Sequence, residues 1–152
     1  LLRTVREESD RATGDRRVPL AVKIAPDLTD DDIVAVARLA QATGLDGVIA
    51  TNTTISREGL VTDADEVERI GAGGLSGAPL RERSMQVLGL LREHLPAQTA
   101  VISVGGVTDA DDVLARLGAG ADLVQGYTAF LYEGPFWAGR INAGLNRALR
   151  RR

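Results

Sequence analysis

Two glycine-containing turns have the residue types and the positions needed to bind an anion. A Gly-Gly pair ending in Gly106 closes an apolar run at residues 100–107, and Tyr127 and Thr128 close a second run at 122–129. Glycine at the end of a strand lets backbone N–H groups approach an anionic group closely. The sequence therefore predicts a phosphate site at these turns, although a Gly-Gly pair by itself also suits a simple tight turn.

Lys23 interrupts a third apolar run, at residues 19–24. A lysine in a strand buried on both faces is rare unless its ammonium group reaches a partner at the strand end. For an interior strand we favour a functional interpretation, in which Lys23 is a fixed cation facing an anionic substrate or cofactor. The alternative is an edge strand from which the side chain extends into water.

A polar cluster, Thr51, Asn52 and Thr53, follows the apolar residues of the run at 47–52. An asparagine amide offers a donor and an acceptor together, which matches the edge of an amide or a pyrimidine ring, and hydroxyl groups add adjustable partners. The same residue types also favour strand ends and turns. The cluster is therefore a candidate binding site for a polar ring, and capping of a strand is the alternative.

Composition excludes several classes of site and partner. The 152 residues include no cysteine and only one histidine, so this segment offers no thiolate metal site and no Ser-His-Asp arrangement. The net charge of −3 is unfavourable for a general nucleic-acid binder. No apolar run reaches the ~20 residues that a membrane-spanning helix needs. The chain ends with the arginines Arg147, Arg150, Arg151 and Arg152, which suit a solvated helix end better than a lipid contact.

The apolar runs that position these residues have the character of parallel strands. They cover residues 19–24, 47–52, 100–107 and 122–129. The runs are continuous and rich in Val and Ile, as expected of strands buried on both faces of a parallel sheet.

Helical periodicity fills the segments between the runs. Helices are expected behind a Thr29 cap, over residues 85–95, behind a Thr108 cap and after Pro135, and a further helix precedes the first run. Alternating strands and helices give a parallel sheet with right-handed crossovers, either doubly wound or closed into a (β/α)8 TIM barrel. Four strand–helix units are half of a barrel of about 250 residues. We therefore predict an α/β fold in which residues 1–152 form the C-terminal part of one barrel domain whose N-terminal half is absent; a four-stranded open sheet is the alternative.

One connection, residues 53–79, is much longer than the others and rich in glycine and acidic residues. Connections of this length inside a compact domain are usually functional or disordered. It follows the carboxyl end of a predicted strand, where barrels carry their active sites. We expect an active-site loop that covers a ligand.

Five motifs from about residue 19 onward resemble, in the same order, the C-terminal half of dihydroorotate dehydrogenase. They read VKIAPDLTDDD, DGVIATNTTISR, GGLSGAPLRERS, SVGGVTDADD and LVQGYTAFLYEGP. The quinone-linked (class 2) branch fits best because of the NTTISR stretch and the YTAFLYEGP ending. That family is a flavin-containing (β/α)8 barrel that oxidises dihydroorotate to orotate in pyrimidine synthesis and passes the electrons to quinone.

The resemblance implies a role for eight residues. Contacts to FMN are implied at Lys23, Thr51, Gly77, Gly106, Tyr127 and Thr128. Contacts to orotate are implied at Asn52 and Thr53. A cation near the pyrimidine end of the flavin, such as Lys23, would stabilise the reduced flavin anion.

Other parts of the family pattern are expected upstream of this segment. They include the serine that is the catalytic base in this branch and the hydrophobic helices that dock on the membrane and admit quinone. The resemblance thus implies a bacterial enzyme bound peripherally to the cytoplasmic side of the membrane, and an isolated segment that is inactive. A class 1 member, a phosphate-binding barrel enzyme without flavin, and a half-barrel that self-associates through its strand edges are the alternatives.

Overall fold

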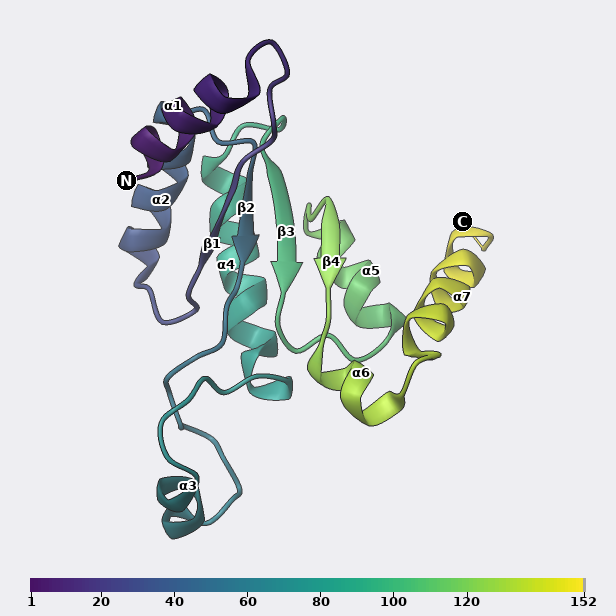
Figure 1. Ribbon diagram of the computed structural model, residues 1–152. Helices are drawn as coiled ribbons and strands as arrows, with labels where there is room; N and C mark the ends of the chain where they lie inside the picture. Colours follow the sequence, from purple (N-terminus) through teal and green to yellow (C-terminus); the bar gives the residue numbers. More distant parts are fainter. Residues whose placement is uncertain (152) are drawn as a thin grey trace.

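Four parallel strands form the framework of the computed structural model, which describes residues 1–151 (Figure 1). They are β1 (Ala21–Ile24), β2 (Gly47–Ala50), β3 (Ala100–Val104) and β4 (Leu123–Gln125). Their order in the sheet is β1-β2-β3-β4, so each strand pairs with the next along the chain. All four predicted strands are confirmed, although each is shorter than its apolar run. The first run is shortened at its start by Pro19 and Leu20, and the other three are shortened mainly by polar and glycine residues at their ends. Arg152, the last of the C-terminal arginines, lies outside the described residues.

Five helices correspond to the predicted helical segments. They are α1 (Leu2–Thr13), α2 (Asp30–Ala42), α4 (Arg81–His94), α5 (Ala110–Gly118) and α7 (Trp137–Leu149). Three further elements were not predicted, namely α3 (Ala64–Ile70), the 3-10 helix η1 (Ala78–Leu80) and α6 (Thr128–Glu133). The predicted run at 122–129 was therefore wrong at its end, where Thr128 begins a helix instead of continuing a strand.

The caps of α2 and α5 are built alike. Thr29 caps α2 as predicted, and it shares a reciprocal capping box with Asp32. At α5 the predicted cap, Thr108, is wrong, because the N-cap residue is Asp109, whose carboxylate accepts from the N–H of Asp112 at 2.9 Å. A carboxylate accepts this bond better than a hydroxyl because the helix N-terminus carries partial positive charge.

Helices cover one face of the sheet. The covered face carries a row of paired residues that includes Val48 and Val101, both fully buried. The alternate row is less buried, and at its two ends Lys23 and Leu123 are exposed. The strands were expected to be buried on both faces. Within residues 1–151 they are well buried on one face only.

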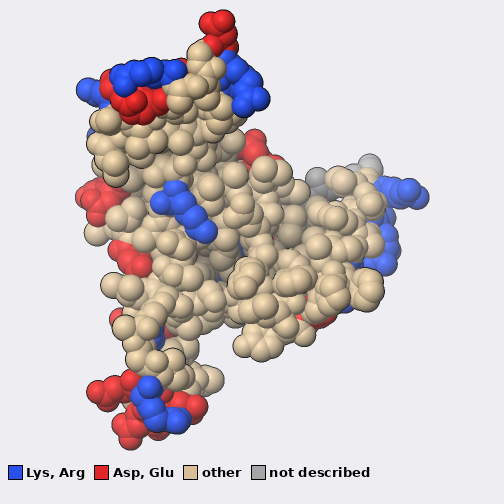
Figure 2. Space-filling model, viewed as in Figure 1, with Lys and Arg blue, Asp and Glu red and all other residues tan. Residues whose placement is uncertain are grey.

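The long connection 53–79 is fixed to the sheet at its base and projects at its middle. Thr54 pairs with Leu75 through an isolated antiparallel bridge, and its hydroxyl group also hydrogen-bonds to Asp27. Figure 1 shows α3 extending well beyond the carboxyl ends of the strands. In Figure 2 charged side chains gather on that projection, on α1 and on α7, whereas the surface over the strands is largely uncharged. Within residues 1–151, no helix is both long enough and apolar enough to cross a bilayer.

Candidate active site

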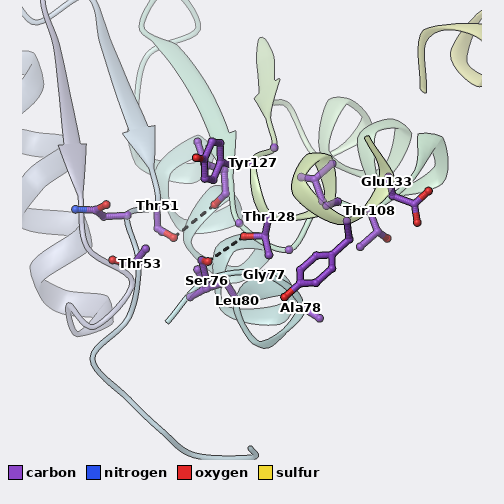
Figure 3. A pocket seen from close by; sticks show the side chains of 18 of the residues that line it. Thr51, Thr53, Ser76, Gly77, Ala78, Leu80, Thr108, Tyr127, Thr128 and Glu133 are labelled. Carbon is purple, nitrogen blue, oxygen red and sulfur yellow. Dashed lines mark hydrogen bonds between the residues drawn. The ribbon is translucent and has the colours of Figure 1, made fainter. Parts of the chain in front are cut away.

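A pocket with a volume of about 550 Å³ lies where the strands end. This size is typical of a site for a small ligand. All eight residues singled out in the sequence line it: Lys23, Thr51, Asn52, Thr53, Gly77, Gly106, Tyr127 and Thr128. Figure 3 shows Thr51 and Thr53 on one side of the pocket, Tyr127 and Thr128 on the other, and Ser76 between them.

The polar cluster after β2 is held by backbone hydrogen bonds that continue the sheet. The N–H of Thr51 donates to the carbonyl of Val104 at 2.8 Å, and that of Asn52 donates to the carbonyl of Ile24 at 2.7 Å. Thr51 is buried, whereas Asn52 and Thr53 are exposed. Among residues 1–151, the side-chain amide of Asn52 makes no hydrogen bond. Its donor and acceptor therefore remain free to bind a ligand.

Lys23 provides the cation of this pocket. It lies in β1, which pairs with another strand on one side only within the described residues. In this segment β1 is therefore an edge strand, which was the alternative interpretation for Lys23. Its side chain is exposed and also lines the pocket. None of the ion pairs in residues 1–151 includes Lys23. Its positive charge is therefore not neutralised by a carboxylate of the described chain.

Gly77 brings the end of the long connection against α6. Its φ of +88° lies in the left-handed region, and a Cβ at this position would be 3.0 Å from Thr128 Cγ2. The hydroxyl of Thr128 donates to Ser76 Oγ at 2.9 Å across the same contact (Figure 3). Only glycine combines this backbone conformation with such close packing.

The Gly105–Gly106 turn presents backbone to the pocket. Gly106 has a φ of +69°, and a Cβ there would be 2.6 Å from the Cα of Arg81. Among residues 1–151, no acceptor pairs with the N–H of Gly106. Gly106 is a buried residue, and backbone N–H groups of such residues rarely lack a partner in folded proteins, so this turn is a candidate donor to an anion.

The N-terminus of α5, which follows this turn in the chain, is capped by groups of the chain itself. Partial burial alone would raise the pKa of Asp112. Hydrogen bonds from the hydroxyl and N–H of Thr108, together with Arg81 at 3.0 Å, outweigh burial and hold that pKa below its usual value. Asp112 is thus ionised at this helix end, and the free donor nearby belongs to the Gly105–Gly106 turn.

Comparison with known proteins identifies the family. A family model described as dihydroorotate dehydrogenase matches residues 1–149. The chain belongs to the dihydroorotate dehydrogenase family.

Members of this family resemble the chain closely in sequence. A protein of Kocuria rhizophila named dihydroorotate dehydrogenase (quinone) is 68% identical over 152 residues, which are 99% of this chain and 42% of that protein. A protein of the same name from an Arthrobacter species is 61% identical and is likewise covered over 42% of its length. The chain thus spans less than half of these relatives. Their names confirm the predicted resemblance to the quinone-linked branch.

A solved structure confirms the fold. The crystal structure of the Eimeria tenella dihydroorotate dehydrogenase in complex with ferulenol matches 91% of this chain with a TM-score of 0.80 and 39% identity, and the match covers 36% of that chain. The four strand–helix units described above are therefore part of the dihydroorotate dehydrogenase barrel. The doubly wound sheet and the isolated open sheet were the wrong alternatives.

Several residues that line the pocket of this family member were not singled out from the sequence. They include Ser76 at the end of the long connection, Thr108 in the loop before α5, and Tyr132 and Glu133 in α6. The carboxylate of Glu133 is paired with Arg140 at 2.7 Å. Three of them lie in motifs of the family resemblance, Ser76 in GGLSG and Tyr132 and Glu133 in YTAFLYEGP, whereas Thr108 was expected only as a helix cap.

Proposed function

We propose that this chain is part of a quinone-dependent dihydroorotate dehydrogenase, which oxidises (S)-dihydroorotate to orotate in pyrimidine biosynthesis. In this proposal the segment supplies contacts to FMN and part of the orotate site. The observation that carries it is the convergence of eight residues, spread from Lys23 to Thr128, on one pocket of a family member. The active-site role of connection 53–79 belongs to the same proposal, because Thr53 and Gly77 lie at its two ends.

The pocket fits the chemical groups of FMN. The unpaired N–H of Gly106 suits a phosphate oxygen, and the hydroxyl of Thr128 and the backbone of Gly77 lie in the same pocket. An aromatic ring is present at Tyr127, which is 70% exposed. Backbone donors next to hydroxyl groups are the usual means by which barrels bind phosphate.

The remaining residues suit the reacting end of the cofactor and the substrate. When bound, FMN supplies a ring system that accepts a hydride. In this proposal the unneutralised positive charge of Lys23, which lines the same pocket, would stabilise negative charge that develops on the ring. Asn52 and Thr53 offer free hydrogen-bonding groups that match the ring edge of orotate.

We place the catalytic base outside this segment. Among residues 1–151, Ser76 is the only serine that lines the pocket, and its hydroxyl oxygen accepts a hydrogen bond from Thr128. Ser84 and Ser103 are fully buried beneath the pocket and contact a guanidinium group. Quinone binding and peripheral attachment to the cytoplasmic face of a bacterial membrane are likewise proposed for the rest of the protein.

A chimera tests this function. Residues 1–152 would replace the matching segment of the Kocuria rhizophila relative, which is 68% identical, and the intact relative would serve as the control. We expect the purified chimera to be yellow, to release FMN on denaturation, and to oxidise dihydroorotate with a soluble quinone. A folded chimera without flavin would overturn the proposal, as would thermal stabilisation by a sugar phosphate but not by FMN.

A further inference from the structure

Arg116 is a buried cation directly beneath the pocket. It lies in the last turn of α5 and is 1% exposed. One end of its guanidinium group donates to Ser103 Oγ in β3 at 2.6 Å. The other donates to Ser84 Oγ in α4 at 3.0 Å and to the carbonyl of Gly105. The side chain thus joins two secondary-structure elements to the glycine turn.

The charge of Arg116 has no direct carboxylate partner. None of the ion pairs in residues 1–151 includes it, and its Nε has no hydrogen-bond partner there. Burial is the main cause that lowers its pKa; nearby Asp112 opposes that effect and Arg81 adds to it. An arginine nevertheless stays protonated in proteins. A buried, unneutralised charge is costly, so stability alone is a poor reason for its presence.

The contact with Gly105 fixes the orientation of one peptide unit. The Gly105–Gly106 bond is trans, so the carbonyl and the N–H of this unit point in opposite directions. Arg116 binds the carbonyl from the buried side, and Ser84 Oγ lies 3.0 Å from the same oxygen. The N–H of Gly106 therefore faces away from Arg116, at a turn whose two glycines line the pocket.

We propose that Arg116 is a positioning residue for anion binding: it holds the Gly105–Gly106 peptide so that the N–H of Gly106 donates to the terminal phosphate of the cofactor. The glycines lack side chains that could fix this unit by packing, and both have positive φ values, +123° and +69°. A fixed donor binds an anion better than one that must first be ordered. This inference rests on the proposed function as an FMN enzyme.

The test compares FMN with riboflavin, which lacks only the phosphate. Arg116→Met and Arg116→Gln would be made in the chimera, the flavin removed, and the dissociation constants of both flavins measured by fluorescence quenching. We expect either variant to bind FMN about tenfold more weakly, on the scale of one hydrogen bond to a charged group. Riboflavin affinity should change by less than about twofold, because the affected donor meets only the phosphate.

Arg92→Met is the matched control. Arg92 is also largely buried and donates to backbone carbonyls, including that of Thr99 at 2.9 Å, but it does not line the pocket. Its loss should lower stability and leave the FMN-to-riboflavin affinity ratio unchanged. If a folded Arg116 variant has the same FMN-to-riboflavin affinity ratio as the unsubstituted chimera, the positioning role is wrong. If the unsubstituted chimera itself binds no FMN, the proposed function has failed instead.

Discussion

Gly77 and Thr128, 51 positions apart in the chain, are in such close contact that a Cβ on Gly77 would lie 3.0 Å from Thr128 Cγ2. The contact joins the end of the long connection to the start of α6, and the bond between Thr128 and Ser76 reinforces it. One wall of the pocket is therefore made by two segments in contact through Gly77, Ser76 and Thr128.

Gly77→Ala should weaken this wall. The added Cβ crowds Thr128, and the φ of +88° costs an alanine about 1–2 kcal/mol. We expect FMN affinity and stability to fall together, measured by flavin titration and urea unfolding of the chimera. Gly73→Ala is the control, because a Cβ there meets nothing within 4 Å and its φ is unstrained. Equal behaviour of the two variants would contradict the role of the contact.

Gly106→Ala should disturb the anion-binding turn more severely. A Cβ at this position would be 2.6 Å from the backbone Cα of Arg81, which cannot move aside as a flexible side chain can. We expect the variant to be purified with less than about a tenth of the FMN of the unsubstituted chimera, given a loss of at least one charge-assisted hydrogen bond.

The control for Gly106→Ala is Gly89→Ala in α4, where a Cβ meets nothing within 4 Å. That change should stabilise the helix by up to about 1 kcal/mol and leave FMN content unchanged. Full FMN occupancy in Gly106→Ala, measured from the flavin absorbance per protein, would contradict the phosphate site.

The strands and most of the residues that line the pocket could be predicted from local sequence, whereas Gly77 was indicated only by the family resemblance. A continuous run rich in Val and Ile indicates a parallel strand in any surroundings. Glycine or hydroxyl-bearing residues at the end of such a run indicate the edge of the sheet at which a barrel has its active site. Parallel strands bring these ends together, which is why Lys23 and Thr128 line one pocket. The cap of α5 was harder to predict because Thr108 and Asp109 are both good N-cap residues.

Arg116 shows what the sequence could not reveal. It lies in a polar position of a helix whose apolar stripe is otherwise clear, and such a residue is usually exposed. Its burial follows from contacts with Ser84 and Ser103, which are 32 and 13 positions away. No periodicity in a single sequence encodes those pairings. The start of α6 was misread for a related reason: Thr128 and Ala129 were assigned to the end of an apolar run, and a short apolar run cannot be told from part of a helix by pattern alone.

Lys23→Met should slow flavin reduction with little effect on stability. The ammonium group has no ion-pair partner among residues 1–151 and the side chain is exposed, so its loss removes no internal contact. We expect reduction of the bound flavin by dihydroorotate to slow about 10- to 100-fold in stopped-flow absorbance measurements, as for loss of one electrostatic contact to developing charge.

Arg38→Ala is the control for Lys23→Met, because Arg38 is an exposed cation of α2 that does not line the pocket. It should leave the reduction rate unchanged. An unaltered rate in Lys23→Met would show that this charge does not act on the flavin.

Asp112→Asn should change how the stability of the protein depends on pH. The folded-state pKa of Asp112 lies below its usual value of 3.8, so its ionised form stabilises the fold. This contribution is complete at pH values above 3.8 and is lost as pH falls through the lower folded-state pKa. Urea unfolding of the chimera from pH 3 to 7 should therefore show Asp112→Asn about 1 kcal/mol less stable near neutrality, with the difference shrinking at the acid end. A difference that stays constant over the whole range would mean that Asp112 stabilises α5 by hydrogen-bond geometry and not by its charge.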